Sequence, residues 1–139
     1  LEFSRTVGAD KIINTATSYS EIEKLQIGKG CFDVAIECSG SPLGINDAIK
    51  CLKPRGTLIQ LGLGGDVQMP LVLVTTKEIK LKGSFRFHSE FELAVNMMQK
   101  QLIDVKPLIT HKIPFKNAEH GFKIAINKYE NSMKVQLTF

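Results

Sequence analysis

Residues 31–65, CFDVAIECSGSPLGINDAIKCLKPRGTLIQLGLGG, contain two apolar runs separated by an amphipathic run and small-residue turns. The first run, FDVAIE at 32–37, is short and nearly continuous, which is typical of a strand covered on both faces. Apolar residues then recur at a helical period and stop before Pro54, and TLIQL at 57–61 returns as a second strand. This order of strand, helix and strand predicts a right-handed crossover in a parallel sheet.

Small residues follow each of these two strands, as CSG at 38–40 and as GLGGD at 62–66. Parallel strands end at the same edge of a sheet, so both turns open toward one crevice, where α/β proteins commonly bind nucleotides. The sequence contains no G-x-G-x-x-G motif, and GLGGD has the wrong spacing to replace it. These residues therefore predict only half of a dinucleotide site.

The rest of the chain continues this alternation of helices and strands. Glu78–Phe87 alternates apolar and polar residues, as in an edge strand, and Ser89 with Glu92 forms a capping-box pattern. The two prolines of VKPLITHKIPF, at 105–115, favour an extended excursion over a sheet interior. Further helices are predicted at 1–7, 18–25, 89–98 and 117–126, a short helix or turn after Pro70, and further strands at 11–14 and 134–139.

We therefore predict a single α/β domain over residues 1–139, a Rossmann-like three-layer structure with a mostly parallel sheet. It would lack its first strand or strands and the G-x-G-x-x-G loop. The chain begins at Leu1 inside a helical pattern, so we expect it to be a piece of a longer protein.

Composition excludes several classes of function. The net charge of +4 is spread along the sequence without the clustered basic residues of a nucleic-acid-binding protein. No apolar run approaches the length of a membrane span. Cys31, Cys38 and Cys51 have no metal-binding spacing and read as reduced core residues, which favours a cytoplasmic location.

The motifs FDVAIECSGSP, LKPRGTLIQLGLGG and KEIKLKGSFRF, followed by DVKPLITHKIPFKNAEHGFK and NSMKVQLTF, are similar to the carboxyl-terminal part of zinc-type medium-chain dehydrogenases. Among these the sequence most resembles polyol dehydrogenases of the sorbitol and L-idonate 5-dehydrogenase type. The resemblance implies a parent enzyme that oxidises a secondary alcohol on a polyol or sugar acid with NAD or NADP, and with zinc. It also implies that residues 105–139 return toward a catalytic domain that carries the zinc ligands.

The resemblance also assigns site residues. It places Cys38, Ser39 and Gly40 beside a coenzyme ribose, and Leu61, Gly62 and Leu63 along the nicotinamide ribose. Ser84 and Phe85 would hold the carboxamide, Arg86 would pair with a substrate carboxylate, and Lys134 would pair with the pyrophosphate. The alternatives are a surface arginine at 86 and a solvated lysine at 134. Glu37 is predicted to be a hydrogen-bonded structural carboxylate, with coenzyme contact as its alternative.

Three functional hypotheses follow from these assignments. The first is a fragment of a dehydrogenase that is inactive alone and binds coenzyme weakly or not at all, because the zinc ligands and the phosphate loop are missing from the sequence. The second is a dimerisation module that pairs through the Glu78–Phe87 edge strand. The third is a noncatalytic nucleotide-binding domain.

Overall fold

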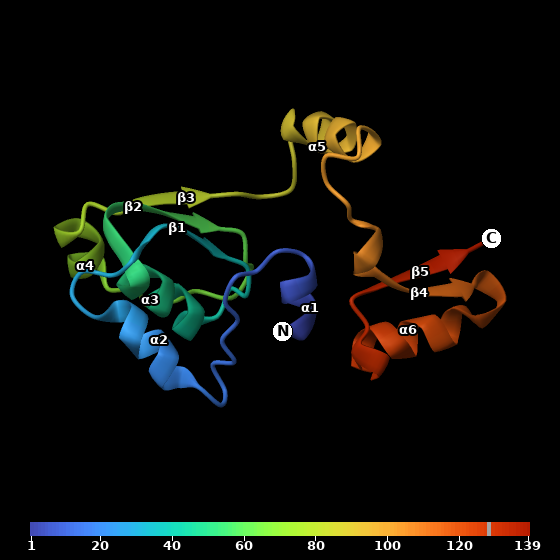
Figure 1. Ribbon diagram of the computed structural model, residues 1–139, viewed down its shortest axis with the longest axis horizontal. Helices are drawn as coiled ribbons and strands as arrows, with labels where there is room; N and C mark the ends of the chain where they lie inside the picture. Colours follow the sequence, from blue (N-terminus) through green and yellow to red (C-terminus); the bar gives the residue numbers. More distant parts are fainter. Residues whose placement is uncertain (128) are drawn as a thin grey trace. The chain divides into compact units, whose positions relative to one another are not determined.

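A computed structural model describes residues 1–127 and 129–139 of the chain. It divides the chain into two compact units, Leu1–Arg86 and Phe87–Phe139, and each is described here by itself (Figure 1). All strand pairs in both units are parallel. The α/β class and the parallel strands predicted from the sequence are confirmed.

The first unit is a three-stranded sheet in the order β1-β2-β3, with helices packed on it (Figure 1). Its elements are α1 (Glu2–Thr6), α2 (Tyr19–Gln26), β1 (Phe32–Glu37), α3 (Pro42–Cys51), β2 (Leu52–Gln60), α4 (Leu71–Thr76) and β3 (Lys80–Gly83). Helix α3 packs against β1 and β2, and α2 packs against α3. The predicted crossover from the first strand through a helix to the second is therefore present.

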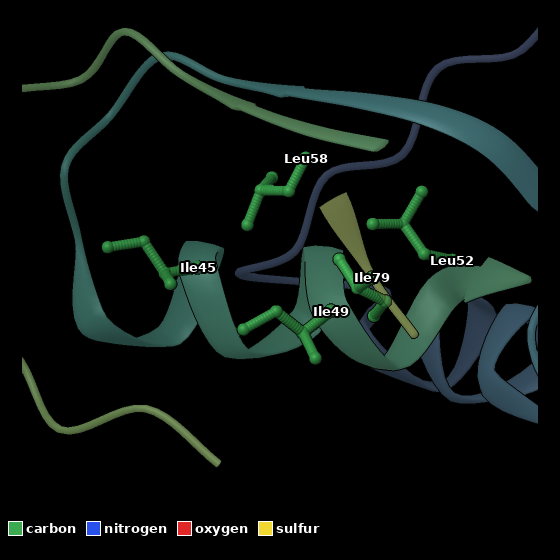
Figure 2. Packing of buried hydrophobic residues seen from close by; sticks show 5 residues of the cluster. All are labelled: Ile45, Ile49, Leu52, Leu58 and Ile79. Atoms are coloured by element: carbon green, nitrogen blue, oxygen red, sulfur yellow. The ribbon is translucent and has the colours of Figure 1, made fainter. Parts of the chain in front are cut away.

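Helix α3 begins at a capped turn and supplies one side of the core. The Ser41 side chain accepts a hydrogen bond from the Gly44 backbone N at 3.0 Å, and Pro42 stands at the first helical position. The core comprises one cluster of buried side chains from α3, β2 and the residue before β3, seen in Figure 2: Ile45, Ile49, Leu52, Leu58 and Ile79. Burial of each such side chain contributes roughly 1.5–3 kcal/mol, so this cluster is what fixes α3 beneath the sheet.

The second face of the sheet is exposed. Val34 and Ile36 on β1 keep 53% and 61% of their surface accessible, whereas Ala35 between them packs against the core cluster. The sequence predicts β1 to be covered on both faces, and in this chain it is covered on one. Residues 1–86 thus place no layer over Val34 and Ile36, although a continuous apolar run is typical of strands covered on both faces.

Strand boundaries differ from the predicted ones in two places. Strand β2 begins at Leu52, five residues early, and the ladder to β1 shifts register where Arg55 takes a positive φ of 64°. Strand β3 covers only Lys80–Gly83 of the predicted Glu78–Phe87, and it forms an edge of the sheet as predicted. Its pairing stops at Gly83, which lies opposite Gln60.

Two local predictions are wrong. Residues 11–14 form no strand, because the Asn14 side chain accepts from the Ala16 backbone N at 3.0 Å and turns the chain. Ser89 makes no capping hydrogen bond, because its backbone is already helical, with φ −60° and ψ −25°. A capping side chain reaches the first turn from an extended backbone, so the Ser89–Glu92 box does not form.

The second unit is a two-stranded parallel sheet with one helix packed on it. Its elements are α5 (Glu90–Gln99), η1 (Lys106–Leu108), β4 (Ile109–Pro114), η2 (Phe115–Asn117), α6 (Ala118–Asn127), η3 (Tyr129–Asn131) and β5 (Lys134–Thr138). The extended excursion is thus a paired strand, and Pro114 stands at its end, where no further ladder bond is needed. Gly121 of α6 lets the helix approach β5, with Leu137 3.2 Å from where a Cβ would be.

Several apolar side chains are exposed, and so are two of the three cysteines predicted to lie in the core. Phe91 and Met98 on α5 are exposed, and the Phe91 ring instead packs on Phe87, with centroids 4.9 Å apart. Cys51 is buried, whereas Cys31 and Cys38 are exposed, and all three are free thiols. Across the described ranges, every helix is too short or too polar to cross a lipid bilayer.

Candidate functional site at the carboxyl ends of the first sheet

Glycines bring the ends of β1 and β2 into direct backbone contact. A Cβ atom at Gly62 would lie 2.1 Å from the Gly40 backbone N, and one at Gly64 would lie 2.2 Å from the Gly40 carbonyl O. Gly40 also has a φ of +67°, a conformation that disfavours any side chain. Glycine is therefore required at these three positions, which form a smooth backbone surface between the two strand ends.

A buried carboxylate lies directly behind this surface. Glu37 is 6% exposed, and its Oε1 accepts hydrogen bonds from the Ser39 backbone N at 2.8 Å and from the Ser39 hydroxyl. Its Oε2 accepts from the Gly40 backbone N at 2.8 Å and from Gln60 Nε2 at 2.7 Å. Gln60 Nε2 also donates to the Gly62 carbonyl at 2.9 Å. One carboxylate thus links the turn after β1 to the end of β2.

The Glu37 carboxylate is held in its charged form. Burial raises the pKa of this group, but hydrogen bonds from the Ser39 hydroxyl, the backbone of Gly40 and Ser39, and the Gln60 amide together lower the pKa below its ordinary value. The predicted structural role of Glu37 as a hydrogen-bonded carboxylate is confirmed. The same bonds place a negative charge one hydrogen bond behind the glycine surface.

The glycine surface forms one wall of a pocket of about 340 Å³. The pocket lies at the carboxyl ends of the three strands, and its lining combines glycine backbone with apolar side chains. Its lining residues are Gly40, Ile45, Gln60, Gly62, Leu63, Gly64, Gly65, Val67, Met69, Leu81 and Gly83. A wall without side chains allows a flat or extended ligand to approach the main chain closely.

The predicted coenzyme residues divide into those that line this pocket and those beside it. Gly40, Gly62 and Leu63 line it, and Leu63 is 76% exposed. Cys38 and Ser39 belong to the same turn as Gly40 and are exposed, although Ser39 is committed to Glu37 through both its hydroxyl and its backbone.

Ser84, Phe85 and Arg86 follow the last pocket residue of β3. The Ser84 backbone N donates to the Gln60 carbonyl at 2.9 Å, which ties this segment to the end of β2. The Arg86 guanidinium lies over the Phe85 ring, 5.0 Å from its centroid, and Arg86 has a positive φ of 59°. The guanidinium is exposed, so it is free to meet an anionic group.

Lys134 belongs to the second unit, where it stands at the start of β5 opposite Ile109. Its exposed side chain is compatible with the predicted pairing with an anion. Its role at the pyrophosphate remains a prediction.

The sequence reasoning gave no role to several residues that line the pocket, among them Ile45, Gln60, Val67, Met69, Leu81 and Gly83. The sequence did contain a signal for Gln60, since it is the one amide side chain within the largely apolar strand TLIQL. Val67 and Met69 lie in a stretch without regular periodicity, where no pattern indicated their direction.

Comparison with known proteins resolves what kind of chain carries this pocket. The family described as "Zinc-binding dehydrogenase" matches residues 1–100. The chain belongs to this family.

Relatives of this zinc-binding dehydrogenase chain include sugar-acid and polyol enzymes. L-idonate 5-dehydrogenase (NAD(P)(+)) of Escherichia coli strain K12 is 35% identical over 140 residues, which is 100% of this chain and 40% of the relative. Sorbitol dehydrogenase of Bos taurus is 35% identical over 127 residues, 88% of this chain and 36% of the relative. The crystal structure of the E. coli L-idonate 5-dehydrogenase superposes with a TM-score of 0.90 over 100% of this chain and 40% of that one. The chain thus spans about two-fifths of the length of these relatives.

The residues of the zinc-binding dehydrogenase chain fit one of the family's two expected groups. The glycine surface and the pocket fit a nucleotide that lies against backbone at strand ends. A zinc ion does not fit, because residues 1–127 and 129–139 contain no group of three or more His, Cys, Asp or Glu side chains that could hold a metal. A zinc ion in a complete enzyme would need ligands from other residues.

Proposed function

We propose that this chain supplies the nicotinamide side of the coenzyme pocket in a zinc-dependent dehydrogenase, which oxidises a secondary alcohol of a polyol or sugar acid with NAD or NADP. The observation that carries this proposal is the glycine-walled pocket at the carboxyl ends of three parallel strands, in a chain of the zinc-binding dehydrogenase family. The name of the E. coli relative supports a sugar acid as the substrate class and NAD(P) as the coenzyme.

Each part of the pocket has a proposed role in holding the coenzyme. The turn Cys38–Gly40 and the segment Leu61–Leu63 would contact ribose, where the Gly40 and Gly62 backbones permit close approach. Ser84 and Phe85 would hold the carboxamide, because Ser84 is fixed to the end of β2. Lys134 would neutralise pyrophosphate charge.

Arg86 is the proposed substrate contact. Its exposed guanidinium follows β3 directly, and a guanidinium can pair with a sugar-acid carboxylate through two parallel hydrogen bonds. A neutral polyol offers no such carboxylate, so Arg86 would favour a sugar acid over sorbitol.

The chemistry requires a pocket that orients the reactants and excludes water. When bound, NAD(P)⁺ supplies the acceptor for the hydride of the alcohol carbon. The chain's own contribution is positional: the glycine surface sets the depth of the ligand, and the apolar side chains of Val67, Met69 and Leu81 keep water from the opposite wall.

We propose further that the chain alone has no dehydrogenase activity and binds NAD or NADP weakly or not at all. The sequence has no G-x-G-x-x-G loop to receive pyrophosphate, and the described residues hold no metal site. Activity would require the zinc-bearing part of such an enzyme.

A chimera tests the proposed function. This chain would replace the matching 140-residue segment of the E. coli L-idonate 5-dehydrogenase, and the chimera and the isolated chain would be assayed for NAD(P)-dependent oxidation of L-idonate. We expect oxidation by the chimera and none by the isolated chain. The variant Arg86→Met in the chimera should raise KM for L-idonate and leave the affinity for coenzyme unchanged.

Three results would contradict parts of this proposal. A folded chimera that binds neither coenzyme would refute the coenzyme role, and oxidation by the isolated chain would refute its dependence on other residues. Strong binding of NAD, NADP or AMP to the isolated chain by calorimetry would instead support the noncatalytic nucleotide-binding module.

Assembly is a second candidate function, and the position of β3 favours it. Strand β3 lies at an edge of the sheet, so the backbone of Glu78–Phe87 could pair with the same strand of a second copy. Lys80 and Lys82 are exposed there and oppose close pairing by their charge. Sedimentation at micromolar concentration separates the outcomes, since a dimer supports the assembly role and a monomer refutes it.

A further inference from the structure

The group with the most hydrogen bonds in the candidate site, the Glu37 carboxylate, is not among the residues that line the pocket. Glu37 accepts four hydrogen bonds from side chains and backbone of three residues, and its own carbonyl accepts two more, from the backbone N atoms of Leu61 at 2.8 Å and Gly62 at 2.9 Å. Buried carboxylates are costly unless each oxygen is satisfied. So dense a set of partners around one charge indicates that the charge itself is used.

We propose that Glu37 is a positioning residue of the coenzyme pocket, and that its negative charge makes the pocket prefer the oxidised coenzyme, whose nicotinamide ring is cationic, over the neutral reduced form. The inference rests on the proposed function, because it requires the nicotinamide to occupy this pocket.

The positioning half of the proposal follows from which atoms Glu37 holds. Two of its donors, the Gly40 N and the Gln60 amide, belong to residues that line the pocket, and Gln60 passes the contact on to the Gly62 carbonyl. The turn after β1 and the end of β2 are thus held at the spacing that brings Gly40 and Gly62 into contact.

The Gln60 side chain takes part in this network only as a hydrogen-bond donor. Its Nε2 makes both of its hydrogen bonds within the network, while its buried Oε1 has no partner among the described residues. An amide rotated by 180° would satisfy Oε1 poorly and would direct an acceptor at the carboxylate. The negative charge of Glu37 therefore sets the orientation of the amide in the pocket wall.

The charge half follows from burial and position. The carboxylate is almost fully removed from water and lies one hydrogen bond behind the pocket wall, so solvent screens its field weakly inside the pocket. For a ring about 10 Å from the carboxylate and an effective dielectric constant of about 20, the Coulomb attraction corresponds to roughly a tenfold tighter binding of a cationic ring than of a neutral one.

The test compares Glu37→Gln with two other variants in the chimera defined above. Glutamine keeps the shape but places an NH₂ group against donors and removes the charge, whereas Glu37→Asp keeps the charge on a shorter stem. Asp33→Asn is the matched control, because Asp33 is the other acid of β1, is exposed at the opposite end of the strand, and pairs only with Lys53 at 3.1 Å among its described contacts.

The decisive measurement is the ratio of the NADH and NAD⁺ dissociation constants, obtained by fluorescence and calorimetry. We expect Glu37→Gln to lower the preference for NAD⁺ roughly tenfold, Glu37→Asp to retain most of it, and Asp33→Asn to leave it unchanged. If Glu37 had a purely structural role, its substitution would weaken the binding of both coenzymes equally and leave the ratio unchanged. That result would overturn the inference.

A second measurement in the isolated chain covers the case in which Glu37→Gln perturbs folding. Amide hydrogen exchange at Gly40 should accelerate at least tenfold in Glu37→Gln while the amides at the centre of β2 keep their protection. Unchanged exchange at Gly40 would overturn the positioning role. If the unsubstituted chimera binds neither coenzyme, the proposed function fails and the charge preference fails with it. If the unsubstituted chimera binds both coenzymes and Glu37→Gln leaves the ratio of their dissociation constants unaltered, only this inference is refuted.

Discussion

The substitution Gly62→Ala tests whether the backbone contact between the two strand ends determines the stability of the first unit. The added methyl carbon would stand 2.1 Å from the Gly40 N and 2.7 Å from the Cys38 carbonyl carbon, whereas ordinary contact begins at 3.4 Å. The turn would have to move by about 1.3 Å, the difference between 2.1 and 3.4 Å. A third close atom, Glu37 Oε2 at 2.6 Å, belongs to a side chain, but the Gly40 and Cys38 atoms are backbone, so rotation of a side chain cannot relieve the clash.

The cost follows from what that movement breaks. The Gly40 N bond to Glu37 and the Leu61 and Gly62 N bonds to the Glu37 carbonyl would be lengthened beyond use. At about 1 kcal/mol for each of the three bonds and about 1–3 kcal/mol for overpacking, the free energy of unfolding should fall by about 4–6 kcal/mol. That loss is a large share of the ~5–15 kcal/mol available to a domain.

Native-state hydrogen exchange at the β2 amides is the suitable assay, because it reports the opening free energy of the first unit without contributions from the second. Gly65→Ala is the matched control, since a Cβ there meets nothing within 4 Å, and it should cost less than about 0.5 kcal/mol. If both variants lose the same small amount, the backbone contact does not determine stability and the reasoning is wrong.

Further predictions concern capping and titration. Ser41→Ala should lower the stability of the first unit by about 1 kcal/mol in urea denaturation, because it removes the hydrogen bond to the α3 amino end, whereas Ser18→Ala, which removes no such bond, should cost less. Lys77→Met should cost about 1–3 kcal/mol at pH 7, because buried Lys77 Nζ donates to the Ile49, Lys50 and Leu52 carbonyls at the end of α3 at 3.2, 2.8 and 2.8 Å. Burial lowers the pKa of Lys77. Between the folded pKa and about 10.5 the unfolded chain therefore binds more protons than the folded chain, so the free energy of unfolding should rise with pH across that window. Lys77→Met should show no such rise. The lowered pKa of Glu37 stabilises the fold above about pH 4.5. In acid titrations of the unsubstituted chain this contribution to the free energy of unfolding should be lost as the pH falls through the folded pKa, and Glu37→Gln should show no such loss.

Sequence reasoning located the elements of the first unit where local signals agreed with tertiary packing. FDVAIE is correctly predicted as a strand from its continuous apolar run, although one of its faces is exposed. The helix after Ser41 is correctly predicted because its apolar period matches the face that packs against the core. The strand at 11–14 is absent because local turn chemistry at Asn14 replaced sheet pairing, which an apolar pattern does not reveal. The pocket glycines were identifiable, whereas the contact of Gly62 with Gly40 depends on how two strand ends meet in space.

The apolar side chains of α6 show a second reason why burial could not be predicted from the sequence. Phe122 and Ile126 continue a helical stripe and are exposed, while Gly121 and Ile124 are buried. A stripe predicts which residues share a face, but the surface that the face covers has to be present in the same chain. The missing third layer over Val34 and Ile36 has the same cause.

The parallel pairing of β4 with β5 has a consequence for how the chain is made. Residues 109–114 pair with residues 134–138, so the ladder of the second unit is completed by nearly the last residues of the sequence. During synthesis on a ribosome this unit cannot close until those residues have left the exit tunnel, whereas the first unit can form earlier from Leu1–Arg86. Vectorial synthesis thus imposes an order on the two units, and loss of β5 would leave β4 without a partner strand among the described residues.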